Sequence, residues 1–112
     1  MKKHLMIIGA LFAATPAEAQ NRVLDNGNEI LSMCDDDSNF MAGLCLGYIR
    51  GISTATDAFL ATDNQFICYP DNVSMGQLRD VVVSYIKRNP SLRHETATLL
   101  YMKATTEAWP CK

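Results

Sequence analysis

Residues 39–60 decide the fold, and they read NFMAGLCLGYIRGISTATDAFL, the longest stretch of helical periodicity in the chain. Its large apolar residues and one alanine recur at steps of three and four, as on one face of an α-helix. They are Phe40, Leu44, Tyr48, Ile52, Ala55 and Phe59. This pattern predicts a helix over 39–60 whose apolar stripe packs against a core.

Three glycines lie four residues apart along the edge of that stripe, at Gly43, Gly47 and Gly51. Inside a helix each costs about 1 kcal/mol relative to alanine, so a compensating contact is expected. Another backbone packed closely into the groove would supply it. The sequence favours a neighbouring helix of the same chain and leaves a homodimer seam as the alternative, while Arg50 and Asp57 exclude a bilayer helix.

Three more helices are predicted around this one. A short helix is predicted at residues 28–34, and we expect it to begin a few residues before that stretch. Ser74 opens a third helix, with Gln77 at the capping-box spacing, and its inward residues are Leu78, Val81, Val82, Tyr85 and Ile86. A fourth runs from Ser91 to about Ala108, with Ala97, Leu100, Tyr101, Ala104 and Ala108 inward. The predicted fold class is therefore all-α, a small bundle of about four helices.

The first 19 residues have the features of an export signal. Lys2 and Lys3 are followed by an apolar run over 5–14, and residues 17–19 form an A-x-A cleavage signature. An ordinary N-terminal core helix is the alternative. Removing the leader from the 112 residues leaves 93, over 20–112, which is the size of one domain. We expect this domain to be periplasmic, with no membrane anchor after signal cleavage.

All four cysteines, Cys34, Cys45, Cys68 and Cys111, lie in the mature part. In an oxidising compartment an even number predicts two disulfides that staple the bundle. Three pairings are open, and we favour Cys34–Cys45, which closes a helical hairpin, with Cys68–Cys111, which ties down the C-terminus. A four-cysteine zinc site is the alternative, but no C-x-x-C pair is present.

Composition and charge narrow the function. The chain is 48% hydrophobic and 20% charged, which is typical of a globular domain rather than a disordered one. Without the leader, eight basic and eleven acidic residues remain. This balance argues against a nucleic-acid partner, and no motif indicates a cofactor or a metal.

Catalytic motifs are sparse. The mature part has one histidine, His94, and a nucleophilic site built around it would need a free thiol or a serine elbow. An enzyme is therefore disfavoured, and exposed polar loops are the better candidates for binding a partner. These are Asp35, Asp36 and Asp37, for which calcium chelation is a weaker reading, then Asp63, Asn64 and Gln65, and the turn at Asn89–Pro90.

Four motifs together resemble the Rap/Tai immunity family of type VI secretion. They are CLGYIRG over 45–51, CYP over 68–70, QLRDVVVSYIKRNP over 77–90 and AWPC over 108–111. The resemblance departs from the family pattern at Trp109, where phenylalanine is expected, and at Leu44, where an aromatic residue is frequent. It implies a periplasmic, all-helical, dimeric protein that neutralises a peptidoglycan amidase by placing a loop in the toxin's cysteine–histidine cleft.

Our leading hypothesis is therefore an exported immunity protein that binds and occludes a cell-wall amidase, working as a homodimer. The alternative is a periplasmic stress or chaperone-like helical protein, suggested by the small size, the disulfides and the apolar helix faces. A third hypothesis, an enzyme that uses His94, ranks below both.

Overall fold

The computed structural model describes residues 25–60 and 67–112 of the chain. In these residues it contains four α-helices and one short 3-10 helix: α2 (Gly27–Cys34), α3 (Asn39–Leu60), α4 (Met75–Arg88), η1 (Pro90–Leu92) and α5 (Ala97–Ala108). The prediction of an all-α fold is confirmed. The predicted export signal lies outside the described residues. Among the helices that are described, none has the length and apolar character needed to cross a membrane.

Polar side chains cap the N-termini of these helices. Asn26 and Glu29 form a capping box at α2: the Asn26 side chain accepts from the backbone N–H of Asn28 and Glu29, and Glu29 accepts from the Asn26 N–H at 2.8 Å. At α4 the Ser74 hydroxyl accepts from the Gln77 N–H at 3.0 Å, as the sequence predicts. Such caps satisfy backbone donors that have no partner within the helix. The predicted bounds of α3 are confirmed.

The last helix begins later than predicted, at Ala97 rather than Ser91. Pro90 instead starts the 3-10 turn η1, and the Thr96 hydroxyl caps α5 by accepting from the Leu99 N–H. The Ala97 N–H donates to the Asp25 carbonyl at 2.7 Å, so the start of α5 is tied to the segment before α2. This long-range contact is not visible in the local pattern around Ser91.

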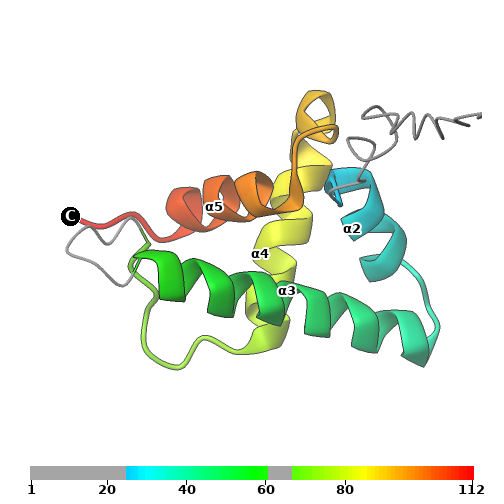
Figure 1. Cartoon of the computed structure of the whole chain (residues 1–112), viewed down its shortest axis with the longest axis horizontal. Coiled ribbons are helices and arrows are strands. Elements are labelled where there is room, and N and C mark those ends of the chain that lie inside the picture. The colour runs from blue at the N-terminus through cyan, green and yellow to red at the C-terminus, as the bar shows by residue number, and fades with distance from the viewer. Residues whose placement is uncertain (1–24, 61–66) are drawn as a thin grey trace, which may run out of the picture.

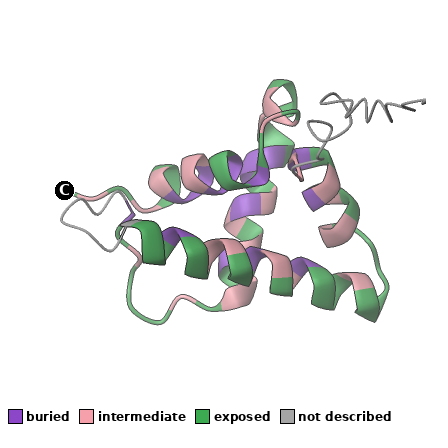
Figure 2. Cartoon of the chain, in the orientation of Figure 1, coloured by how far each residue is buried: buried purple, intermediate pink, exposed green. Residues whose placement is uncertain are grey.

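α4 is the centre of the bundle and contacts each of the other three α-helices (Figure 1). The side chains with no exposed surface come from all four: Ile30, Ile49, Val82, Ile86, Leu100 and Tyr101. Figure 2 shows that α5 and α4 carry many of the buried positions. Of the residues predicted to point inward, Val81 is half-buried and Ala108 is exposed, because Ala108 is the last residue of α5.

Most of the apolar stripe predicted to bury α3 is exposed. Phe40 is 76% exposed, Leu44 44% and Phe59 85%, whereas the buried positions of α3 are Cys45, Ile49 and Thr56. Successive residues of an α-helix are rotated by about 100°, so a face centred on Ile49 turns the Tyr48 stripe to the side. The prediction of a core-facing stripe was therefore wrong at Phe40, Leu44, Ala55 and Phe59, which are exposed. Tyr48 and Ile52 of the same stripe are half-buried and pack against the edge of the core.

Both disulfides follow the favoured pairing, with Cys34 bonded to Cys45 and Cys68 to Cys111. The first joins the end of α2 to the first half of α3. The second joins the segment before α4 to the C-terminus beyond α5. With all four thiols in disulfides, the alternative of a four-cysteine zinc site is wrong.

Candidate functional site

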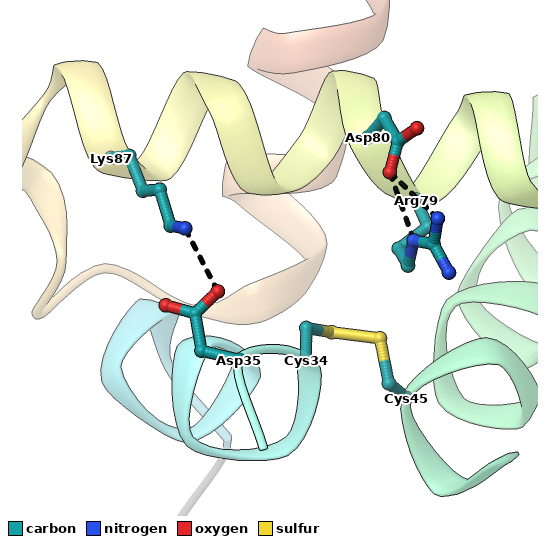
Figure 3. The surroundings of a disulfide bond; sticks show 6 residues. All are labelled: Cys34, Asp35, Cys45, Arg79, Asp80 and Lys87. Atoms are coloured by element: carbon teal, nitrogen blue, oxygen red, sulfur yellow. Dashed lines mark hydrogen bonds and ion pairs between the residues drawn. A yellow bond between two sulfur atoms is a disulfide. The ribbon is translucent and has the colours of Figure 1, made fainter. Parts of the chain in front are cut away.

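The connection between α2 and α3 is an exposed acidic loop with its two ends joined. The Cys34–Cys45 disulfide bridges it, and Asp35 pairs with Lys87 of α4 at 2.8 Å (Figure 3). Inside the loop, hydrogen bonds from the side chain and backbone of Ser38 hold the pKa of the Asp36 carboxyl below its ordinary value. The loop is therefore a fixed, negatively charged turn on the surface rather than an unrestrained tether.

The segment that follows the other end of α3 is anchored by the C-terminus. The Cys68 N–H donates to the Trp109 carbonyl at 3.0 Å, beside the Cys68–Cys111 disulfide. The ring of Tyr69 packs on that of Trp109 at a centroid distance of 5.6 Å. The hydroxyls of Tyr69 and Tyr101 share a hydrogen bond. These contacts lock residues 67–69 to α5.

Burial, followed by the hydrogen bond with Tyr101, raises the pKa of Tyr69 well above its ordinary value. Tyr69 thus keeps its proton across the physiological range and serves as a structural hydrogen-bond partner. The sequence analysis did not identify Tyr69, Tyr101 or Trp109 as anchors. A local signal was present, because Tyr69 directly follows one cysteine of a disulfide and Trp109 comes two residues before the other.

A polar cleft of about 440 Å³ opens beside this anchored segment. Its walls come from α3, from the turn before α4 and from the start of α4, and include Ser53, Asp57, Tyr69, Asp71 and Asn72. Asn72 takes a left-handed backbone conformation, with φ of 66°, which asparagine tolerates better than most residues. The cleft can offer carboxylates and an amide to a partner that reaches this end of the molecule.

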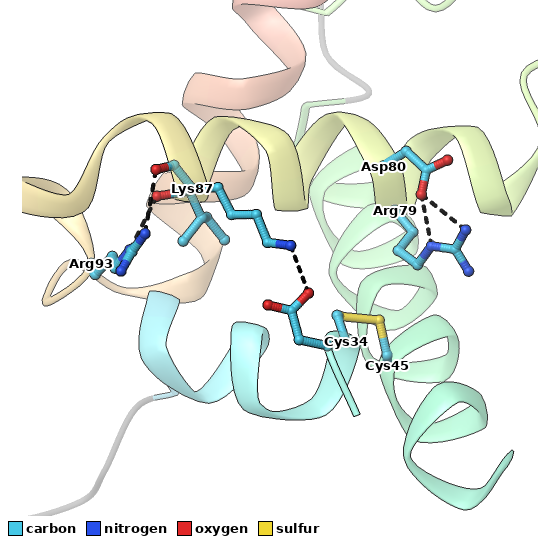
Figure 4. Close-up of polar contacts among 8 residues, drawn as sticks. Cys34, Cys45, Arg79, Asp80, Lys87 and Arg93 are labelled. Atoms are coloured by element: carbon cyan, nitrogen blue, oxygen red, sulfur yellow. Dashed lines mark hydrogen bonds and ion pairs between the residues drawn. A yellow bond between two sulfur atoms is a disulfide. The ribbon is translucent and has the colours of Figure 1, made fainter. Parts of the chain in front are cut away.

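The corner between α4 and α5 is held by hydrogen bonds from a side chain to backbone carbonyls. Arg93 donates to the carbonyls of Ile86 and Lys87, both at 3.3 Å, where α4 ends (Figure 4). His94, the candidate catalytic residue, is exposed, and its Nε2 lies 3.7 Å from Glu95. Because every cysteine is in a disulfide, His94 has no thiol to activate. The turn at Asn89–Pro90 is part of this corner.

The structure places the predicted partner-binding residues at opposite ends of α3. Asp35, Asp36 and Asp37 precede the helix and are all exposed. Asp63, Asn64 and Gln65 follow its last residue and lie outside the described residues. A 22-residue helix is about 33 Å long. The acidic group before α3 is therefore the one whose position the structure describes, and the group at 63–65 stays a prediction.

The three glycines of α3 meet no neighbour in the part of the chain that is described. A Cβ added at Gly43, Gly47 or Gly51 would find nothing within 4 Å. None of the described helices therefore packs against these glycines as the favoured interpretation requires. Their alternative role as a homodimer seam stays a prediction.

Beside Gly47 and Gly51, α3 and α5 leave an apolar groove of about 540 Å³. Tyr48 is one of the residues that line it, and burial first and a hydrogen bond with Asp25 second raise the pKa of Tyr48 to about 12. In residues 25–60 and 67–112, no group of three or more histidine, cysteine or acidic side chains is arranged to hold a metal ion.

Comparison with models of known protein families identifies one family that matches the chain. The family model for Rap1a immunity proteins matches residues 26–111, which include all four helices and both disulfides. No curated protein and no solved structure matches the chain. The resemblance drawn from the four sequence motifs is thus confirmed at the level of the family, and the chain belongs to the Rap1a immunity proteins.

Proposed function

We propose that this protein resides in the periplasm, binds a peptidoglycan amidase delivered by type VI secretion, and protects the producing cell by blocking the toxin's active site. Family membership implies an immunity protein for a type VI secretion effector. The amidase as its target is our inference from the resemblance. The match over residues 26–111 is the single observation that carries the proposal.

Periplasmic residence is supported by the disulfides and by the export signal expected over 1–19. Two disulfides persist in an oxidising compartment and are rare in the cytosol. A peptidoglycan amidase acts on the cell wall, so an inhibitor must meet it on the outer side of the cytoplasmic membrane. The two expectations agree with each other.

Inhibition by occlusion is supported by how the loops are held. The connection before α3 is closed by the Cys34–Cys45 disulfide, and Lys87 adds an ion pair to Asp35. The second disulfide holds Cys68, on the segment before α4, to the C-terminus. A loop held in one conformation before binding loses less conformational entropy when it binds. Such a loop is suited to blocking a catalytic cleft and needs no catalytic group of its own.

The exposed acidic loop is the better-defined of the two candidates, since the structure describes it. Its carboxylates can accept hydrogen bonds from donors in the cysteine–histidine cleft expected of the toxin. The second candidate is the segment with Asp63, Asn64 and Gln65, which follows α3 in the sequence and lies outside the described residues. We further propose that the working form is a homodimer, as the resemblance implies.

The test is co-expression of the mature chain, exported to the periplasm, with each cell-wall amidase that the producing strain encodes. We expect rescue of growth and co-purification of the two proteins. Replacing Asp35, Asp36 and Asp37 by asparagine, or Asp63, Asn64 and Gln65 by alanine, asks which loop carries inhibition. His94→Ala is the matched control and should rescue as well as the wild type, because His94 is exposed and all four cysteines are in disulfides, so no thiol is available to it.

Failure of rescue and of complex formation with every cell-wall amidase of the producing strain would refute the proposal. Rescue that is lost in the His94→Ala protein, with its fold intact, would refute the blocking mechanism and favour catalysis.

A further inference from the structure

The two disulfides differ in their exposure. In the Cys34–Cys45 bond, which we call the hairpin disulfide, Cys45 is only 1% exposed and Cys34 is half-buried. Cys45 belongs to the core, and Figure 3 shows the bond between α2 and α3 with α4 alongside. In the Cys68–Cys111 bond, which we call the C-terminal disulfide, Cys68 is exposed and Cys111 is half-buried. One bond therefore lies against the core and the other lies at the surface.

Access decides how fast a disulfide exchanges with a thiol. The attacking thiolate must reach one of the two sulfurs, and the other sulfur leaves as a thiolate. At the hairpin disulfide, the core blocks attack on Cys45. Attack on Cys34 would expel the Cys45 thiolate into apolar surroundings, where burial disfavours a charge. Exchange of the hairpin disulfide therefore requires the fold to open first.

The C-terminal disulfide has neither obstacle. A thiolate can approach from the side of the exposed Cys68, and the sulfur that leaves belongs to Cys111, which is half-buried and adjoins the exposed Lys112. This exchange needs no opening of the helices. Its rate depends on access, whereas the contribution of the bond to stability depends on the separation of 43 residues that it closes.

Contacts that involve no sulfur atom hold the two cysteines of this bond together. The Cys68 N–H donates to the Trp109 carbonyl at 3.0 Å, and Ile67 forms an isolated antiparallel bridge with Pro110. The ring of Tyr69 packs on that of Trp109. Because these contacts do not depend on the disulfide, they keep the two thiols adjacent after reduction. The bond can therefore re-form within the same chain.

We propose that the C-terminal disulfide is a reversible redox site of the folded protein, which a dithiol reduces and a disulfide oxidant re-forms while the hairpin disulfide stays closed. Thiol–disulfide oxidoreductases of oxidising compartments carry dithiols of this kind. The proposal goes beyond the immunity role and does not depend on the toxin.

The reduction proceeds in two exchanges. A thiolate of the dithiol attacks Cys68 Sγ, the Cys68–Cys111 bond breaks, and Cys111 leaves as a thiolate that takes up a proton released by the dithiol. The second thiolate of the dithiol then attacks the first in the mixed disulfide, and Cys68 is released and protonated. The dithiol loses two electrons and becomes a disulfide, and the C-terminal disulfide gains them and becomes two thiols.

The redox state of this site affects one wall of the polar cleft. Tyr69 and Pro70 line the cleft of about 440 Å³ and directly follow Cys68 in the sequence. In the oxidised protein a covalent bond ties this wall to Cys111. In the reduced protein only the non-covalent contacts with the segment around Trp109 remain, so the wall opens more often.

Timed alkylation measures the difference between the two bonds. The mature, oxidised chain is incubated in native buffer with dithiothreitol, and samples are alkylated with iodoacetamide and mapped by peptide mass spectrometry. We expect label at Cys68 and Cys111 together. Label at Cys34 and Cys45 should appear at least ~100-fold more slowly, because a folded protein is open in only about one molecule in a thousand or fewer. In denaturant both pairs should be labelled at similar rates, which shows that the fold makes the difference.

Trp109 provides a second readout, because it is the sole tryptophan of the chain and lies two residues from Cys111. Its fluorescence should change with the rate constant of labelling at Cys68 and Cys111. The signal should return when glutathione disulfide replaces dithiothreitol. The matched variants are Cys68→Ala with Cys111→Ala, in which dithiothreitol should cause no such change, and Cys34→Ala with Cys45→Ala, in which the change should persist. The labelling of the wild-type chain depends on neither variant.

Circular dichroism of the partly reduced wild-type chain completes the test. A helical signal that persists after Cys68 and Cys111 are labelled supports a redox site in the folded protein. Equal labelling rates for the two pairs, earlier label at Cys34 and Cys45, or loss of the helical signal together with the first label would overturn the proposal. All of these measurements are made without toxin, so they separate a failure of the redox site from a failure of the proposed immunity function.

Discussion

A single methyl group added at Gly27 should destabilise the fold, whereas the same addition at Gly43 should not. A Cβ at Gly27 would lie 2.8 Å from Leu100 Cδ1 and 3.1 Å from the Arg93 backbone. Carbon atoms prefer about 3.5–4.0 Å, so the neighbours must move by about 0.7 Å. Leu100 has no exposed surface into which it could move, and the Gly27 N–H already holds the Arg93 carbonyl at 2.9 Å.

The magnitude follows from two opposing effects. Overpacking a filled site costs about 1–3 kcal/mol. Alanine recovers at most about 1 kcal/mol of helix propensity, and less in the first turn of α2. The net effect of Gly27→Ala is a loss of about 1–2 kcal/mol in the free energy of unfolding. At Gly43, in open space within α3, only the propensity gain remains, so Gly43→Ala should stabilise by up to about 1 kcal/mol.

Urea unfolding followed by circular dichroism, at concentrations where the chain is monomeric, measures both variants. The two midpoints should move in opposite directions from that of the wild type. A Gly27→Ala protein at least as stable as the wild type would show that the α2–α5 contact is not tightly packed, and it would refute this reasoning.

Three further predictions concern the two disulfides and the hydroxyl groups of Thr56 and Tyr48. Replacing Cys68 and Cys111 by alanine should cost about 4 kcal/mol in urea unfolding, against about 3 for the other disulfide, because the separations are 43 and 11 residues; the reverse order would contradict the loop-entropy argument. Thr56→Val should raise the stability of the monomer by about 1 kcal/mol, since it removes a buried hydroxyl that has no hydrogen-bond partner among the described residues, and a marked loss would show that the hydroxyl is paired. Tyr48 should ionise near pH 12 in an ultraviolet titration. Because folding raises its pKa, the stabilising contribution of Tyr48 is complete below pH 10, the usual tyrosine value, and is lost between about pH 10 and pH 12. Tyr48→Phe should remove that step, and an unshifted titration near pH 10 would contradict the buried position beside Asp25.

Local signals in the sequence predicted a helix well where a capping residue directly precedes a stretch of helical periodicity. Ser74 and Gln77 located the start of α4, and α3 has the predicted bounds. The start of α5 depends instead on Thr96 and on a hydrogen bond from Ala97 to Asp25, some 70 residues away in the sequence. Contacts of this kind are set by the tertiary fold and leave no periodic trace.

The orientation of α3 could not be predicted because the helix has apolar residues on two adjacent faces. Ile49 and Cys45 face the core, while most of the Tyr48 stripe, only about 100° away, is exposed. A period of 3.6 residues identifies a helix, but it does not rank two apolar faces. The glycines were read as a sign of close packing within the chain, whereas their surroundings are open.

The number of cysteines alone left three disulfide pairings open. The favoured pairing, which closes a helical hairpin and fixes the C-terminus, is the one that the structure contains. The candidate contact loops were recognised from polarity alone. Polarity could not tell that the two acidic loops lie at opposite ends of a 22-residue helix, since that separation depends on the helix between them.

Titration of a purified cell-wall amidase of the producing strain with the mature, oxidised chain tests the immunity role most directly. We expect hydrolysis of peptidoglycan to fall to zero at one immunity chain per toxin, and the two proteins to elute together. Full amidase activity at a saturating excess of the folded chain, with every cell-wall amidase of the strain, would contradict the role proposed for this protein.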